Sequence, residues 1–205
     1  MKRTRSLGHA QTYLVRNWKF FFMTVLFLLG MLVGALLIRS GSTADNLSFI
    51  FDSFVGKRGE SSFFQTFLLS FSSALLLLMA DFFLGTSLIG VIGTPVVPLF
   101  RGLGLGASIG YLYAFYSWKG LAFSLVLILP HALISSFALV LASKDAFHMS
   151  QTFFSCALAD GSADKIYPTL KRYLVRFIVY FFMICAASLL DALMSALFAR
   201  FIVLT

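Results

Sequence analysis

The sequence predicts an all-α fold: a polytopic bundle of about five transmembrane helices, with a broken Gly/Pro-rich segment between the second and third spans. Three observations predict it. Hydrophobic residues make up 60% of the 205 residues and charged residues 12%, whereas a soluble domain carries about twice that charge. Charge-free runs reach the length of a membrane span. Basic residues lie mostly between these runs rather than within them.

The first span is expected at residues 20–38, an uncharged run of 19 residues that follows five basic residues. A signal-peptide core is only about 7–15 residues long, so we expect this span to remain uncleaved. Residues 39–62 follow as a polar connector. Its middle, NLSFIFDSFVG, has apolar residues at helical spacing and predicts a short amphipathic helix at the membrane surface.

The run from Ser61 to Trp118 holds 58 residues and only two charges, Asp81 and Arg101. Two spans, expected at 64–84 and 99–117, use about 40 of these residues. The surplus falls on residues 85–98, GTSLIGVIGTPVVP, with three glycines and two prolines. It predicts a broken or re-entrant segment, which is stable at membrane depth only where protein covers its backbone.

The last two spans are expected at 120–143 and 173–197. Residues 144–172 between them form the expected inner loop, in which FHMSQTFFSCAL predicts an amphipathic surface helix. One integral membrane domain is expected to fill residues 1–205.

The net charge of +8 indicates a topology rather than a nucleic-acid-binding face, because the basic residues lie between apolar runs. With five spans and a cytoplasmic N-terminus, 11 of the 16 Lys and Arg lie inside and 5 outside. A sixth span at 85–100 would leave 7 inside and 9 outside. The positive-inside rule therefore favours five spans in the cell membrane, with the C-terminus outside.

Small residues at spacing four predict close helix packing. Gly102, Gly106 and Gly110 form the clearest stripe, Gly30 and Gly34 a shorter one, and Ser188, Ala192 and Ala196 repeat the pattern in the last span. Two interpretations stay open: packing within the chain, or packing against a partner, for which a second copy of the chain is one candidate.

Ionisable groups inside a membrane are costly, and each is a candidate for function. Asp81 and Arg101 are expected to pair or to reach the interface, while Asp191 needs a partner, water or a proton. Pro130 predicts a kink in the fourth span. His131 and Ser135 lie one turn apart and are expected to bond the carbonyls that the kink frees; proton or substrate handling is the alternative.

We expect the protein to have no enzymatic activity, because the sequence shows no set of acid, base and nucleophile residues. Cys156 and Cys185 have neither metal-ligand spacing nor a CxxC motif, so neither a metal site nor a disulfide is expected. No cofactor is expected.

The order of several motifs resembles the stage II sporulation protein M family. These are LLGMLVGALL, FLGTSLIGVIGTPVVPLFRGLGLGASIG, WKGLAFSLVLILPHALI and AASLLDALMSA, which run in order over most of the chain. Many members read P-H-G-x-x-E in the fourth span. Here Pro130 and His131 match, whereas Ala132 and Ser135 replace the glycine and the glutamate. Asp191 matches an acidic residue that the family often has in its last span.

The resemblance implies a five-span scaffold for engulfment in the mother-cell membrane. Such a protein recruits the peptidoglycan-degrading stage II sporulation proteins D and P and is not itself the hydrolase. Residues 39–62 and the Gly102 stripe are then the candidate partner surfaces. The alternative is a permease-like subunit that works with a separate ATPase and uses the intramembrane charges and the broken segment.

Overall fold

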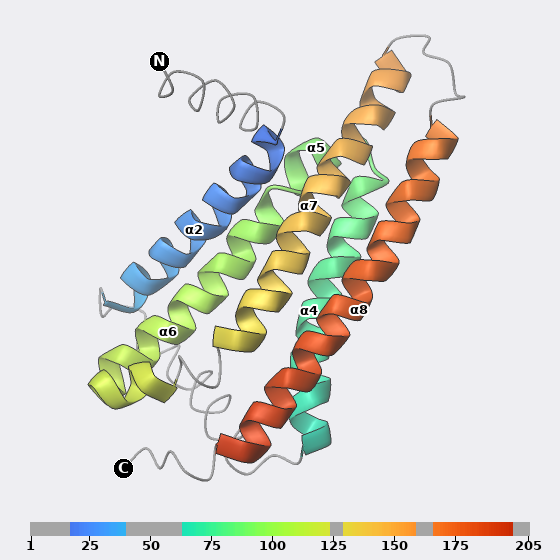
Figure 1. Ribbon diagram of the computed structural model, residues 1–205. Coiled ribbons are helices and arrows are strands. Elements are labelled where there is room, and N and C mark those ends of the chain that lie inside the picture. The colour runs from blue at the N-terminus through green and yellow to red at the C-terminus, as the bar shows by residue number, and fades with distance from the viewer. Residues whose placement is uncertain (1–16, 40–62, 124–128, 159–165, 199–205) are drawn as a thin grey trace, which may run out of the picture.

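The computed structural model describes residues 17–39, 63–123, 129–158 and 166–198 (Figure 1). Its elements in these ranges are the helices α2 (Trp18–Arg39), α4 (Phe63–Gly85), α5 (Gly90–Gly93), α6 (Val96–Phe123), α7 (Leu129–Leu158) and α8 (Ile166–Phe198). Five helices are long and apolar enough to cross a membrane. The predicted all-α bundle of about five spans is confirmed.

The long helices run in alternating directions along the bundle (Figure 1). Helices α2, α6 and α8 run one way, and α4 and α7 run the other. The starts of α2 and α8 therefore lie at the same end of the bundle as the ends of α4 and α7. We call this end the Trp18 end, and the opposite end the Arg39 end.

The bundle contains two packing groups that share α7. Helix α2 packs chiefly on α6, while α4, α7 and α8 pack on one another. Helix α7 also contacts α2 and α6, and 67% of its span is buried, against 22% in α2 and in α4. Helix α7 is thus the central helix, and the other long helices surround it.

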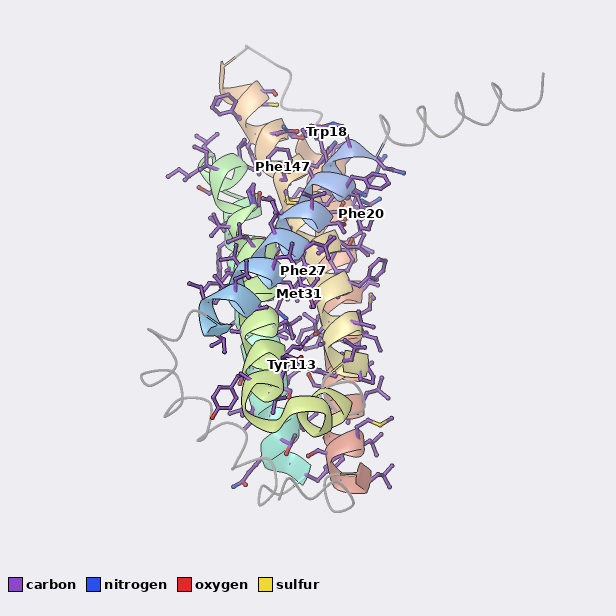
Figure 2. The ribbon with its side chains drawn as sticks, turned by 90° about the vertical axis from the view of Figure 1, so that its left-hand side faces the viewer. Trp18, Phe20, Phe27, Met31, Tyr113 and Phe147 are labelled. Carbon is purple, nitrogen blue, oxygen red and sulfur yellow. The ribbon has the colours of Figure 1, made fainter. Side chains whose placement is uncertain are left out.

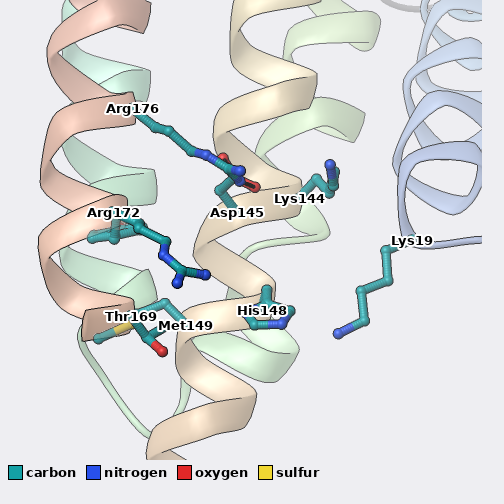
Figure 3. Close-up of a pocket in the computed structure, with 9 residues that line it drawn as sticks. Lys19, Lys144, Asp145, His148, Met149, Thr169, Arg172 and Arg176 are labelled. Atoms are coloured by element: carbon teal, nitrogen blue, oxygen red, sulfur yellow. Dashed lines mark hydrogen bonds and ion pairs between the residues drawn. The ribbon is translucent and has the colours of Figure 1, made fainter. Parts of the chain in front are cut away.

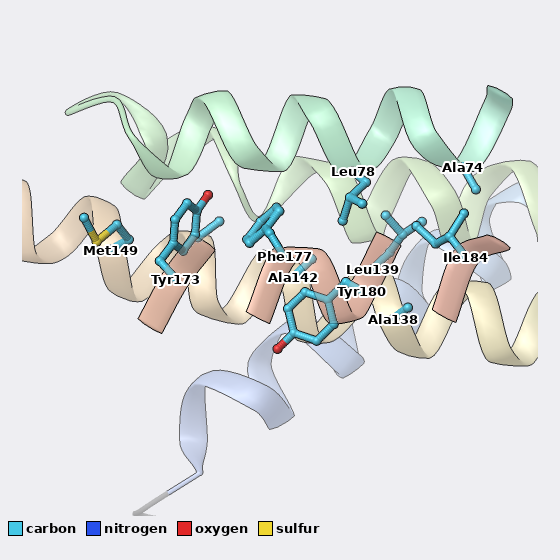
Figure 4. Packing of buried hydrophobic residues seen from close by; sticks show 11 residues of the cluster. Ala74, Leu78, Ala138, Leu139, Ala142, Met149, Tyr173, Phe177, Tyr180 and Ile184 are labelled. Carbon is cyan, nitrogen blue, oxygen red and sulfur yellow. The ribbon is translucent and has the colours of Figure 1, made fainter. Parts of the chain in front are cut away.

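The main apolar core lies between α4, α7 and α8 (Figure 4). Aromatic rings fill it near the Trp18 end, where the ring centroids of Tyr173 and Phe177 lie 4.4 Å apart and Phe82 stacks on Tyr173 at 5.6 Å. Small residues fill it further along, where Ala74, Ala138 and Ala142 are fully buried. Bulky apolar side chains such as Leu76, Phe83 and Phe182 point outward and are exposed, as expected for a surface that lipid solvates.

The predicted break between the second and third spans is present. Helix α4 ends at Gly85, the four-residue helix α5 follows, and α6 begins at Val96, just after Pro95. Side-chain hydrogen bonds help to hold the segment: Thr94 Oγ1 donates to the Gly90 carbonyl at 2.8 Å, and Ser150 Oγ of α7 donates to the Ser87 carbonyl at 2.7 Å. Protein therefore covers part of this backbone, as irregular backbone near a membrane requires.

Several expected boundaries differ from the helices. The turn expected at 118–119 lies inside α6, because a single charge such as Lys119 interrupts hydropathy but not backbone hydrogen bonding. The inner loop expected at 144–172 is mostly helical. Residues 144–158, with the expected surface helix FHMSQTFFSCAL, continue α7, and residues 166–172 begin α8. The amphipathic helix expected within 39–62 lies outside the described residues.

The structure describes the chain around Pro130 only from Leu129 onwards, where α7 begins. Residues 124–128, among them Val126, whose carbonyl a kink at Pro130 would free, lie outside the described residues. The kink expected at Pro130 therefore stays a prediction.

Candidate functional site

The five predicted packing glycines all lie in one seam between α2 and α6. Gly30 and Gly34 of α2 face the backbone of Leu99 and Leu103, while Gly102 and Gly106 of α6 face that of Phe27 and Met31. Gly110 lies further along against Ala35. Figure 2 shows Phe27 and Met31 on α2 where it lies along α6. The stripe therefore packs within the chain, and a partner at these positions would have to displace α2.

The seam brings backbone against backbone. A Cβ atom built on Gly30, Gly34, Gly102 or Gly106 would lie closer than 3.0 Å to backbone atoms of the facing helix. The nearest atom in each case is a carbonyl oxygen, the arrangement in which Cα–H groups donate weak hydrogen bonds. Gly104, two residues from Gly106, has nothing within 4 Å of its Cβ position. The face of α6 that carries Gly102 and Gly106 therefore contacts α2, and the face that carries Gly104 does not.

Three of the predicted intramembrane residues belong to a set of polar groups on four helices. Arg101 Nη2 on α6 donates to Ser135 Oγ on α7 at 2.7 Å, and Ser135 Oγ donates in turn to the Ala132 carbonyl at 3.2 Å. One turn earlier on α7, His131 Nδ1 lies 3.3 Å from the Ala187 carbonyl of α8.

The set continues from α8 to α4. Asp191 follows Ala187 by one turn of α8, is 1% exposed, and accepts a hydrogen bond from Ser70 Oγ of α4. Each of these contacts joins two helices: α6 to α7, α7 to α8, and α8 to α4. Together they fix how far each helix is shifted along its neighbour. His131 thus contacts α8, while the carbonyls expected to bond it in its own helix lie outside the described residues.

Asp81 does not pair with Arg101, contrary to the first of the two expectations. It is fully buried, and its carboxylate accepts a hydrogen bond from Ser143 Oγ of α7 at 2.6 Å. Arg101 meets α7 at Ser135, eight residues from Ser143, which corresponds to about 12 Å along the helix. The two charges therefore lie at different depths of the bundle. Asp81 Oδ1 has no hydrogen-bond partner in the described part of the chain.

The hydroxyl of Tyr173 reinforces the same region. It bonds to the carbonyls of Asp81 and Phe82 at 3.3 and 3.0 Å. Both carbonyls belong to the last five residues of α4, which ends at Gly85. Tyr173 thereby ties the end of α4 to α8.

An ion pair that the sequence did not reveal lies at the Trp18 end. Asp145 of α7 is buried, and both of its oxygens accept from Arg176 Nη1 of α8, at 2.9 and 3.1 Å. The hydroxyl of Tyr180 donates to Asp145 Oδ2 at 2.7 Å. The sequence interpretation placed Asp145 in a loop. One feature of the sequence could have indicated the ion pair: Arg176 and Tyr180 are four residues apart, which puts both on one face of a helix.

The described residues bring no group of three or more His, Cys, Asp or Glu side chains together in a way that would hold a metal ion. Cys156 and Cys185 are free thiols. What the buried polar groups visibly do is bind helices together.

One family model, described as Stage II sporulation protein M, matches residues 23–196 of the chain. The match begins within α2 and ends within α8, so it includes all five long helices, the broken segment and the polar groups described above. The comparisons with curated proteins and with solved structures give no match.

Proposed function

This chain belongs to the stage II sporulation protein M family, and from that premise we propose that it is a non-catalytic membrane scaffold that localises peptidoglycan-degrading proteins during engulfment. Membership makes it a sporulation-related, multi-pass membrane protein. The observation that carries the proposal is the family match across all five helices. The proposed partners are the stage II sporulation proteins D and P.

The arrangement of the polar groups supports a scaffold. Ser70, Arg101, His131, Ser135 and Asp191 bond between helices and hold the bundle in one register. A scaffold needs a fixed shape that presents its loops, whereas a transporter needs a site that opens alternately to each side.

The connector 39–62 is the proposed docking segment, because it joins α2 to α4 at the Arg39 end of the bundle. Segment 159–165 joins α7 to α8 at the opposite end. With a cytoplasmic N-terminus, the connector lies on the outer side of the membrane, where peptidoglycan is, and segment 159–165 lies on the cytoplasmic side. The two segments therefore form a matched pair for a test.

The test is affinity capture of the tagged chain from mild-detergent membranes of the native host at the onset of sporulation, read by mass spectrometry. We expect peptidoglycan hydrolases among the specific partners. Replacing residues 42–60 with a Gly/Ser segment of equal length should abolish their capture, and the same replacement of 159–165 should not. Capture of a nucleotide-binding ATPase without hydrolases would overturn the scaffold proposal in favour of a permease subunit.

Neutralising Asp191 gives a second test that distinguishes a scaffold from a permease subunit. In Asp191→Asn, the side-chain amide oxygen still accepts from Ser70, so this bond between α8 and α4 is kept. We expect hydrolase capture and spore yield within about twofold of the wild type, since no charge is needed at this position for docking. A complete loss of spore formation with normal hydrolase capture would point to a charge-dependent, transporter-like role instead.

A further inference from the structure

A basic pocket of about 290 Å³ lies near the Trp18 end, between α2, α7 and α8 (Figure 3). Its cations come from all three helices. Lys19 comes from α2, Lys144 from α7, and Arg172 and Arg176 from α8, and His148 of α7 lies between them. None of these residues belongs to the polar set that links Arg101 to Asp191, so this pocket is a separate feature of the bundle.

The pocket has more positive than negative charge. Four cations face one carboxylate, that of Asp145, and this carboxylate is already engaged by Arg176 and Tyr180. Lys19 donates to the side-chain oxygen of Gln151 and lies 5.5 Å from the ring centroid of Phe147, both of which are uncharged partners.

Arg172 and Lys144 have fewer partners than the other two cations of the pocket. Neither forms a hydrogen bond or ion pair anywhere in the described part of the chain. Cations that line one pocket repel one another, and a bound anion would relieve this repulsion. Phosphate oxygens fit such a site, because guanidinium and ammonium groups form charge-assisted hydrogen bonds with them.

The depth of the pocket matches the membrane surface. Residues 129–143 of α7 carry no charge, and Lys144 and Asp145, the first charged residues of this helix, both line the pocket. Charged side chains are costly within the hydrocarbon and are favoured at its edges. The pocket therefore lies where hydrocarbon gives way to lipid headgroups.

An apolar stripe on α7 leads from the pocket toward the middle of the bundle. Phe137 and Leu133 are 50% and 58% exposed, and they lie seven and eleven residues before Lys144, on the same helix face. Phe20 of α2 flanks the stripe, with its ring centroid 6.3 Å from that of Phe137. An acyl chain fits such a stripe, whereas a free phosphate has no use for it.

We propose that this pocket binds an anionic phosphate group, and that an anionic phospholipid headgroup, rather than a free phosphate, is its source. The inference is independent of the scaffold role, because it concerns the opposite end of the bundle from the connector 39–62.

The experiment measures binding to the purified full chain in a neutral detergent by native mass spectrometry. Three probes are titrated: phosphatidylglycerol, phosphatidylcholine with the same acyl chains, and inorganic phosphate. The test variants are Arg172→Gln and Lys144→Gln. The control is Lys171→Gln, which removes an equal charge from the neighbouring position of α8, outside the pocket. Thermal unfolding of each variant checks that the bundle is intact.

We expect phosphatidylglycerol to bind more tightly than phosphatidylcholine. Arg172→Gln and Lys144→Gln should each weaken its binding about fivefold to tenfold, the size of one charge-assisted hydrogen bond, and Lys171→Gln should not. If only inorganic phosphate binds with this variant pattern, the phosphate site stands but its lipid source is refuted. If all three variants bind every probe like the wild type, or Lys171→Gln weakens binding as much as Arg172→Gln, the proposal is overturned.

Discussion

At Gly106 the backbones of α2 and α6 lie so close that a single added carbon has no room. A Cβ atom there would lie 2.7 Å from the carbonyl carbon of Met31 and 2.8 Å from its Cα. Neither atom can move without shifting a whole helix. This is the kind of contact that lets helices associate in lipid, where no hydrophobic force drives them together.

We therefore expect Gly106→Ala to destabilise the protein by about 1–3 kcal/mol, the usual cost of overpacking. Gly104→Ala is the matched control, because its Cβ meets open space. It should be neutral or stabilising by up to about 1 kcal/mol, since alanine favours a helix. Thermal unfolding of the two purified variants in detergent measures the difference. Equal melting temperatures would contradict the seam as described.

The buried carboxylate of Asp145 gives a second prediction for a single residue. Tyr180→Phe removes one of its donors and leaves the packing almost unchanged. The expected destabilisation is about 1–2 kcal/mol, because the lost bond is to a charged group. Tyr113→Phe removes the hydroxyl of an exposed tyrosine that makes no hydrogen bond to the described residues, and should leave the unfolding temperature unchanged. A similar shift in both variants would show that the bond to Asp145 contributes little.

Among the elements, the short helix α5 depends most on its neighbours. It has only four residues, too few to be stable alone, and Ser150 of α7 ties the preceding turn to the bundle. We expect Ser150→Ala to speed amide hydrogen exchange of residues 86–93 about fivefold, corresponding to the loss of roughly 1 kcal/mol. Ser72→Ala, which removes a bond within α4 itself, should leave this exchange unchanged. Unchanged exchange in Ser150→Ala would show that α5 is held by packing alone.

The number of spans and the break between the second and third could be predicted because both follow from local composition. An uncharged run of span length predicts a helix, and the glycines and prolines of residues 85–98 predict its interruption. The ends of α6 and α7 could not be predicted in the same way. Lys144 and Asp145 marked the end of a span by charge, yet the helix continues past them because Asp145 has a partner on α8.

The partners of the buried charges were also not predicted correctly. Asp81 and Arg101 are the two charges of one long apolar run, which suggested that they pair. Instead, Asp81 accepts a hydrogen bond from Ser143 and Arg101 donates one to Ser135, and both serines lie on α7. Which face of α7 meets which helix depends on tertiary packing, and no spacing within a single helix contains that information.

On the scale of the whole molecule, the alternating helices place the start of α2 and the end of α8 at opposite ends of the bundle (Figure 1). The two native cysteines test the orientation. Cys156 lies in the last turn of α7, at the Trp18 end, and Cys185 lies near the middle of α8. With a cytoplasmic N-terminus, a membrane-impermeant maleimide should label Cys156 in inverted vesicles but not in intact cells, and Cys185 in neither. Labelling of Cys156 in intact cells would reverse the proposed topology.

The central position of α7 also has a consequence for biogenesis. Helix α4 is made second, yet it packs chiefly on α7 and α8, which are made last. While only the first three spans have left the ribosome, the face of α4 that carries Thr66, Ser70 and Asp81 has not yet met those helices. An aspartate at the centre of a spanning helix costs about 2.5–3.5 kcal/mol on the insertion scale, and Asp81, four residues before the end of α4, is expected to cost part of this. The nascent chain at this stage is therefore a substrate that a membrane insertase would be expected to shelter until α7 emerges and Ser143 reaches Asp81.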